Sequence, residues 1–324
     1  MVSQLKYCVK YALGRDIADG RFTVFPDDIF LASYPRSGNT WARFLLANLI
    51  FPNEDVSFTS IGRLVADPAR SSKKFLNNLS RPRILKSHHP FDSRYRKVIY
   101  LVRDPRDVVI SEYFNAQKKM RIDSRVSLDQ YVEQFVAGES SFYGSWWENV
   151  ASWIAVRQGH PSFLLIRYED LLRRTLHEVS RITEFLSINV SVQRMGEVVN
   201  RSSFDQMREL EQKQADLWDV TKDTRKDIPF IRSAKAGGWK TSLSQRSAHL
   251  IESAWSPLMS ALGYEATGEL AEMPESASLA ALDRLHQQMP SPELAGARMP
   301  SAGALVWLYN PEPRRWPLHA AVGR

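Results

Sequence analysis

The sequence predicts an α/β fold in which a single domain is built around a central parallel β-sheet flanked by helices. Short apolar runs alternate with longer amphipathic patterns, as parallel strands joined by helical crossovers require. The run Lys97–Arg103 is almost continuously apolar, which is typical of a strand covered on both faces. We divide the 324 residues into an N-terminal segment 1–24, a domain over 25–268, and a Pro- and Ala-rich tail 269–324 that we expect to be disordered.

The predicted strands and helices follow one another in a regular order. A first strand at Ile29–Ala32 leads through a turn of small and polar residues into a helix over Trp41–Ile50. The third strand, Lys97–Arg103, ends where Asp104 begins a helix, and Pro105 suits the first turn of that helix. The other predicted elements are a short second strand that starts at Arg83 and is stopped by Pro90, a fourth strand at Phe163–Tyr168, helices at 144–159, 169–187, 191–210 and 244–262, and a mobile polar loop at 211–230.

Composition and charge narrow the class of protein. The formal net charge is +7, but no basic stripe interleaved with aromatics is present, so a polyanionic cofactor fits at least as well as nucleic acid, and we expect no nucleic-acid partner. The single cysteine, Cys8, excludes an intrachain disulfide and a Cys-based metal cluster. No window approaches 18 apolar residues, and 1–20 lacks the apolar core of a signal peptide. We therefore expect no membrane span and a cytoplasmic location.

The stretch after the first strand has the layout of an anion site. Strand, tight loop and helix present backbone N–H groups and a helix N-terminus to a phosphate-like group, as a P-loop does. Gly38 allows close approach of the backbone, and Arg36 adds a cation that can fork onto phosphate or sulfate oxygens. Side-chain donors are expected from Ser37, Asn39 and Thr40. The loop is not a Walker A motif, because no Gly precedes Gly38 by five residues and no Lys follows it.

Polar groups stand at the ends of three predicted strands. They are Arg36–Thr40 after the first strand, Lys86–His88 after the second, and Arg103 at the end of the third. In an open parallel sheet the ligand crevice lies at the carboxyl ends of the strands. These three segments are therefore expected to meet at one edge.

These motifs, in this order, resemble those of the cytosolic-type sulfotransferases, which use 3′-phosphoadenosine 5′-phosphosulfate (PAPS). We take the chain to be a bacterial-type member of that family. The resemblance covers roughly residues 25–264. Tyr34–Trp41 resembles the family's 5′-phosphosulfate loop, Lys86–Pro90 its catalytic Lys-Thr-His-x-Pro, and Val102–Ser111 its 3′-phosphate motif. Arg232–Trp239 is similar to the closing Arg-Lys-Gly-x-x-Gly-x-Trp, with Ser233 and Ala234 replacing the Lys and the first Gly.

The resemblance implies a role for each matched residue. The 5′-phosphosulfate is expected to lie on Arg36, Ser37, Gly38, Asn39 and Thr40. Trp41 and Phe204 would sandwich the adenine, and Tyr168 and Ser203 would hydrogen bond to it. Arg103, Ser111 and Arg232 would hold the 3′-phosphate, although Ser111 lies about two helical turns beyond Arg103. The catalytic groups would be His88 as general base with Lys86 and Arg36, and no metal is implied.

Other interpretations stay open at this point. Trp41 and Tyr168 suit a hydrophobic core, and Arg103 could pair with Asp104 or Asp107. A P-loop-type nucleotide kinase and a non-catalytic nucleotide-binding module on the same fold are the alternative functions. The acceptor is a hydroxyl or amine on a small molecule, glycan or lipid-linked compound, and the oligomeric state is open.

Overall fold

Residues 21–267 are described in the computed structural model of the chain. Most of the predicted segment 1–24 and all of the tail 269–324 lie outside these residues, so the domain bounds stay a prediction. Within the described range, no helix combines the length and the apolar character that crossing a membrane requires.

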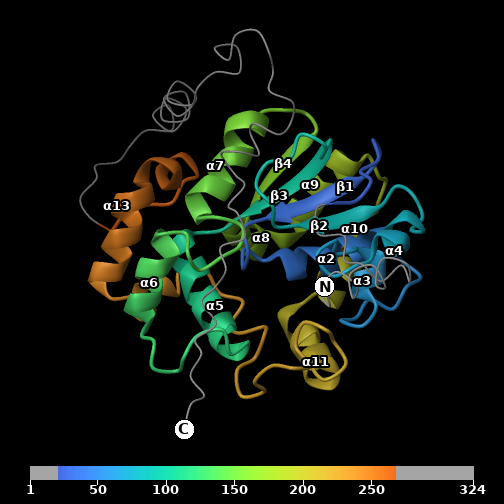
Figure 1. The fold of residues 1–324 in the computed structure, drawn as a ribbon. Helices are drawn as coiled ribbons and strands as arrows, with labels where there is room; N and C mark the ends of the chain where they lie inside the picture. Colours follow the sequence, from blue (N-terminus) through green and yellow to red (C-terminus); the bar gives the residue numbers. More distant parts are fainter. Residues whose placement is uncertain (1–20, 268–324) are drawn as a thin grey trace, which may run out of the picture.

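Four parallel strands form the central sheet, in the order β2-β1-β3-β4 (Figure 1). Their bounds are Ile29–Ser33 for β1, Ile84–Ser87 for β2, Lys97–Val102 for β3 and Phe163–Arg167 for β4. In the centre β1 pairs with β2 on one side and β3 on the other, with Leu31 opposite both Lys86 and Ile99. This register brings the carboxyl ends of β1, β2 and β3 together, and the predicted α/β class is confirmed.

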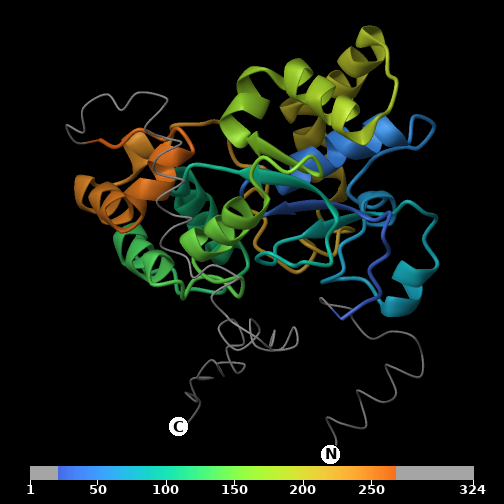
Figure 2. The same cartoon turned by 90° about the horizontal axis from the view of Figure 1, so that it is seen from above.

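The two faces of the sheet are covered by different helices, because successive strand residues point to opposite sides. Phe30 and Tyr100 pack with one set of helices, and Leu31 and Ile99 pack with the other. The first set is α5 Pro105–Lys118, α6 Leu128–Val136, α7 Trp146–Arg157 and α13 Gln245–Ala261. The second is α2 Asn39–Ile50, α8 Tyr168–Arg173, α9 Thr175–Leu186 and α10 Val192–Arg201. Figure 2 shows the sheet between these two layers.

Several elements differ from the sequence prediction. The predicted helix over 169–187 is interrupted at Arg174, and the segment 51–81 contains two short helices that periodicity did not indicate. The helix α6 was not predicted either. The additional bounds are α3 Ile61–Leu64, α4 Lys73–Asn77, α11 Phe204–Gln214 and α12 Trp239–Ser242.

The stretch 211–230 is more structured than its polar composition predicts. Its start belongs to α11, and Trp218 is buried with its ring 4.5 Å from that of Phe58 and 5.0 Å from that of Phe230. The buried Glu211 carboxylate accepts hydrogen bonds from the backbone N–H groups of Phe230 and Ile231. A few buried side chains therefore fix a segment that is polar on average.

Candidate active site

The loop between β1 and α2 depends on backbone conformations with positive φ. Arg36 has φ of 66° and Gly38 has φ of 92°. A Cβ on Gly38 would lie 2.5 Å from Cδ2 of Tyr168, so the loop has room only for glycine there. Gly38 is also the N-cap of α2, and the first N–H groups of that helix have no intrahelical partner. The loop therefore offers main-chain donors next to the Tyr168 ring.

The Arg36 side chain extends from this loop and contacts Ser111 and Phe230. Its Nε donates to Ser111 Oγ at 3.0 Å, and its Nη2 donates to the carbonyl of Phe230 at 3.3 Å. The guanidinium also lies 4.7 Å from the centre of the Phe230 ring. Burial and repulsion from Arg103 lower the pKa of Arg36 to about 10, so it stays charged at neutral pH. Phe230 was not anticipated from the sequence, because nothing in its local pattern indicates a contact with Arg36.

The hydroxyl and amide side chains of the loop differ in whether they already have hydrogen-bond partners. Ser37 is fully buried, and its Oγ has no hydrogen-bond partner within residues 21–267. The Asn39 amide donates to the carbonyl of Leu31 at 3.3 Å and to Ser33 Oγ at 3.1 Å. The side-chain donors of Asn39 are therefore used inside the β1–α2 connection, and its backbone N–H is what it can offer a ligand. Thr40 is half-buried in the first turn of α2.

Lys86 at the end of β2 is paired with a carboxylate that the sequence did not reveal. Its Nζ lies 2.7 Å from Asp67 Oδ2, and the two side chains are 15% and 9% exposed. Burial would raise the pKa of Asp67, but Lys86 and Arg43 outweigh it and hold that pKa far below its usual range. Burial lowers the pKa of Lys86, and Asp67 opposes the shift. Asp67 lies in the irregular segment 51–81, where no spacing links it to Lys86.

His88 is oriented by the backbone of β1. Its Nδ1 lies 2.8 Å from the carbonyl of Ser33, so the hydrogen bond assigns the proton to Nδ1 and leaves Nε2 as an acceptor. The Asn149 amide donates to the His88 carbonyl at 2.9 Å, and the Tyr143 ring stands edge-on to the imidazole. Burial and the charge on Lys86 lower the pKa of His88 to about 3. The imidazole is therefore neutral over the whole physiological range.

His89 has different surroundings from its neighbour. Its backbone N–H donates to Ser87 Oγ at 3.1 Å, and its ring is perpendicular to that of Tyr143, with 5.3 Å between the centres. Tyr143, which the sequence analysis gave no role, thus contacts both histidine rings.

Arg103 links the loop after β1 to the segment before α12. Its Nη1 donates to the carbonyl of Arg36 at 3.3 Å, and its Nη2 donates to the carbonyl of Lys235 at 3.0 Å. The guanidinium lies 4.2 Å from the centre of the Tyr168 ring. Ser111 bonds to the side chain of Arg36, so it reaches the Arg103 cluster through Arg36. The ion pair with Asp107 considered above is long, at 3.9 Å.

Asp107 instead anchors the glycine-containing segment near the C-terminal end of the site. Its carboxylate accepts hydrogen bonds from the backbone N–H groups of Gly237 at 2.7 Å and Trp239 at 3.0 Å. This holds 232–239 against the start of α5. The Arg232 guanidinium lies 4.9 Å from the Phe114 ring centre, and its buried Nε has no hydrogen-bond partner within residues 21–267.

The aromatic residues expected around an adenine are brought into one region. Trp41 Nε1 donates to the carbonyl of Ser202 at 2.9 Å, and its ring stands edge-on to Tyr168 at 6.0 Å. Ser203 is the N-cap of α11 and accepts from the N–H of Gln206, so its Oγ already has a structural partner. Phe204, which follows it, is 38% exposed. An exposed aromatic ring two residues after the carbonyl that Trp41 contacts can stack on a planar ligand.

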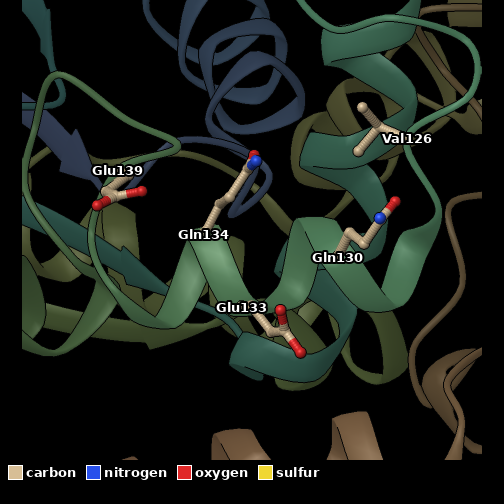
Figure 3. A pocket seen from close by; sticks show the side chains of 5 residues that line it. All are labelled: Val126, Gln130, Glu133, Gln134 and Glu139. Carbon is tan, nitrogen blue, oxygen red and sulfur yellow. The ribbon is translucent and has the colours of Figure 1, made fainter.

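Two hollows differ in whether the residues at the strand ends line them. A small cavity beside Lys86 and His88 is lined by Phe22, Asp67, Pro68, Ala69, Ser87, His89, Tyr95 and Tyr143. A larger surface hollow of about 430 Å³ lies along α6, and Val126, Gln130, Glu133, Gln134 and Glu139 line it (Figure 3). None of the strand-end residues lines the larger hollow. The small cavity is therefore the one that opens onto the cluster.

Comparison with known proteins agrees with this arrangement. The sequence model of the sulfotransferase domain family matches residues 26–263. Sulfotransferase 1E1 of Bos taurus is 32% identical over 235 residues, which cover 68% of this chain and 79% of that protein. The 3-beta-hydroxysteroid sulfotransferase of Cavia porcellus is 30% identical over 237 residues, which cover 70% of this chain and 81% of that protein.

Solved structures share the fold. Retinol dehydratase in complex with androsterone and the inactive cofactor PAP has a TM-score of 0.65 at 18% identity, with 79% of this chain and 85% of that chain covered. Mouse sulfotransferase SULT7A1 complexed with PAP has a TM-score of 0.63 at 20% identity, with 83% and 92% covered. The chain belongs to the sulfotransferase family. It is accordingly a PAPS-dependent transferase of sulfuryl groups.

Proposed function

We propose that this enzyme moves the sulfuryl group of PAPS to a hydroxyl or amine acceptor, with His88 as the general base. The observation that carries the proposal is the neutral imidazole of His88, which keeps Nε2 as an acceptor beside the Lys86 ammonium. A neutral imidazole within reach of an acceptor proton is suited to general-base catalysis. Both side chains border the same small cavity at the sheet edge.

The nucleotide would lie across the β1–α2 loop. The 5′-phosphosulfate is assigned to the backbone of 36–40 and the Arg36 guanidinium, which together offer donors and positive charge. Arg103 and Arg232, whose buried Nε atoms both lack partners within residues 21–267, are assigned to the 3′-phosphate with Ser111. Trp41, Tyr168, Ser203 and Phe204 are assigned to the adenine.

The chain's own groups then account for the transfer step. The acceptor oxygen or nitrogen attacks sulfur in line while His88 Nε2 takes its proton. The bond between sulfur and the bridging oxygen of PAPS breaks, and 3′-phosphoadenosine 5′-phosphate (PAP) leaves. Arg36 and Lys86 stabilise the charge that develops on the transferring group and on the leaving oxygen, without a metal.

A relative is named for hydroxysteroids, and a structural neighbour binds androsterone. For this chain we propose a small-molecule acceptor, and glycan and lipid-linked acceptors remain alternatives. The cytoplasmic location also stays a prediction.

Binding without metal separates this proposal from the kinase alternative. PAP should stabilise the full-length protein against heat in the presence of a chelator, and ATP with magnesium should stabilise it much less. A panel of phenols, alcohols and amines with labelled PAPS would then show transfer. Stabilisation by ATP with magnesium but not by PAP would contradict the proposal, and PAP binding without transfer to any acceptor would favour the binding module.

A further inference from the structure

One face of α5 carries polar residues that extend from Arg36 to the C-terminal end of the helix and that the proposed mechanism does not use. Ser111, Asn115 and Lys119 are four residues apart, so they follow one another along the helix at about 6 Å per step. Ser111 contacts Arg36 at one end. Lys119 is the C-cap residue at the other end.

Unpartnered polar atoms line this face. Asn115 Oδ1 and Glu112 Oε2 are buried and have no hydrogen-bond partner within residues 21–267, and Glu112 is 7% exposed. Burial raises the pKa of Glu112 to about 8, against the opposing effects of Arg36, Arg121 and Lys119. Glu112 therefore carries its proton at neutral pH and does not neutralise Lys119. Buried polar groups without protein partners are satisfied by water or by ligand atoms, so this face can accept a ligand that displaces water.

Lys119 is a half-buried cation with no carboxylate partner within residues 21–267. Its neighbour Lys118, by contrast, donates to the carbonyls of Arg225 and Ile228 at 2.8 and 2.7 Å. The pKa of Lys119 is lowered to about 7 by burial and then by repulsion from Arg121, Arg36, Arg70 and Lys86. Lys119 therefore carries its charge mainly below about pH 7, and it is within electrostatic reach of the two cations assigned to the sulfuryl group.

The cations around Arg36 fall into two groups. Arg103 and Arg232 act on each other and on Arg36, on the side assigned to the nucleotide. Lys119 is repelled by Arg121 and Arg36 and, more weakly, by Arg70 and Lys86. Arg70 is close to Asp67, which lines the cavity beside His88. The charge of Lys119 therefore adds to that of Arg36 and Lys86 and is not among the charges assigned to the nucleotide.

We propose that Lys119 recognises an anionic group on the acceptor, with Asn115 and Glu112 hydrogen bonding to the acceptor between that group and the sulfuryl site. The acceptor is then a compound with a hydroxyl or amine at one end and a carboxylate, sulfate or phosphate at the other. This inference rests on the proposed function, because the acceptor must extend from the cavity beside His88 to the face of α5.

Binding to the PAP-loaded, full-length enzyme at about pH 6, where Lys119 is charged, tests this inference without requiring turnover. The probes are two matched sets of an acid, its amide and an amine, and their binding is measured by calorimetry. The first set is para-hydroxyphenylacetate, its amide and tyramine. The second set is ω-hydroxydecanoate, its amide and the corresponding amino alcohol. A charge-assisted contact contributes about 1.5–3 kcal/mol, so in at least one set the acid should bind about ten- to a hundredfold more tightly than the amide. Lys119→Gln should remove this difference, and Lys119→Glu should reverse it in favour of the amine.

A matched control is available in the loop that follows α5. Arg125→Gln removes the same charge from a side chain that is 89% exposed, and it should leave the preference for the acid unchanged. Equal binding of acid and amide in both sets, no binding of any probe, or an acid preference that survives Lys119→Gln would overturn the inference. Loss of PAP binding by the unmodified enzyme would instead contradict the proposed function, so the two failures are distinguishable.

Discussion

The Lys86 ammonium and the Asp67 carboxylate form a nearly buried ion pair, with 2.7 Å between Nζ and Oδ2. Asp67 also lines the cavity beside His88. The carboxylate offsets the burial that lowers the pKa of Lys86, so it helps to keep this lysine charged. Asp67 is thus placed to position Lys86, which in turn is assigned to the sulfuryl group.

Asp67→Asn is predicted to lower kcat by about ten- to a hundredfold, the effect of losing one hydrogen bond to a charged group. PAP affinity should change little, since Asp67 contacts none of the residues assigned to the nucleotide. The alkaline limb of the pH profile should move to lower pH, because the pKa of Lys86 falls further without the carboxylate. Steady-state kinetics between neutral and alkaline pH measure both effects.

Asp67→Glu is the conservative control and should restore part of the activity. Asp92→Asn removes a more exposed carboxylate that pairs with Arg94, and its kinetics should match those of the unmodified enzyme. An unchanged pH profile in Asp67→Asn would contradict the positioning role, even if the variant were less stable.

His88→Ala is predicted to lower turnover by about 10²–10⁴ while PAP binding stays nearly intact. His89→Ala should cost much less, because only His88 is oriented through Nδ1 by the carbonyl of Ser33. Turnover and PAP titration of both variants test the assignment. Loss of turnover in His89→Ala together with normal turnover in His88→Ala would show that the base is wrongly assigned.

The pH dependence of the imidazole is a separate prediction. The pKa of His88 is lowered to about 3, so its neutral, proton-accepting form persists as the pH falls well below the usual value of about 6.5. In an NMR titration of the free enzyme, the His88 ring should not titrate between about pH 5 and 8. A His88 midpoint near neutrality would contradict the buried, neutral base.

Gly38→Ala is predicted to destabilise the fold and weaken PAP binding together. The new Cβ would meet the Tyr168 ring at 2.5 Å, and alanine is strained at a φ of 92°. We expect a loss of more than about 1 kcal/mol in the free energy of unfolding. Gly196→Ala, within α10 and with open space around it, should be neutral or slightly stabilising. Denaturant melts and PAP calorimetry measure both, and tight PAP binding in Gly38→Ala would contradict the assigned loop.

Local patterns explain why much of the fold was predictable from the sequence. β1, β3 and β4 are apolar runs bounded by polar residues. A parallel sheet must bring the ends of β1, β2 and β3 to one edge, where Arg36, Lys86 and Arg103 are found. The helix after β3 was predicted correctly because Asp104 and Pro105 are strong start signals. These elements depend on neighbours in the sequence.

The missed features depend on contacts between distant segments. Asp67 pairs with a lysine 19 residues away, and Phe230 packs on Arg36 from 194 residues away, so neither leaves a local pattern. The polar composition of 211–230 concealed the buried Trp218. The engagement of the Asn39 amide inside the β1–α2 connection likewise follows from the packing of that helix start.

The most direct test of the account compares two nucleotides on Arg103→Ala by calorimetry. Arg103 is held between the carbonyls of Arg36 and Lys235, at the place assigned to the 3′-phosphate. The variant should bind PAP about ten- to a hundredfold more weakly, the effect of losing a charge-assisted contact of about 1.5–3 kcal/mol. Binding of adenosine 5′-phosphosulfate, which lacks the 3′-phosphate, should change far less. Equal losses for the two nucleotides would contradict the assignment of this site to PAPS.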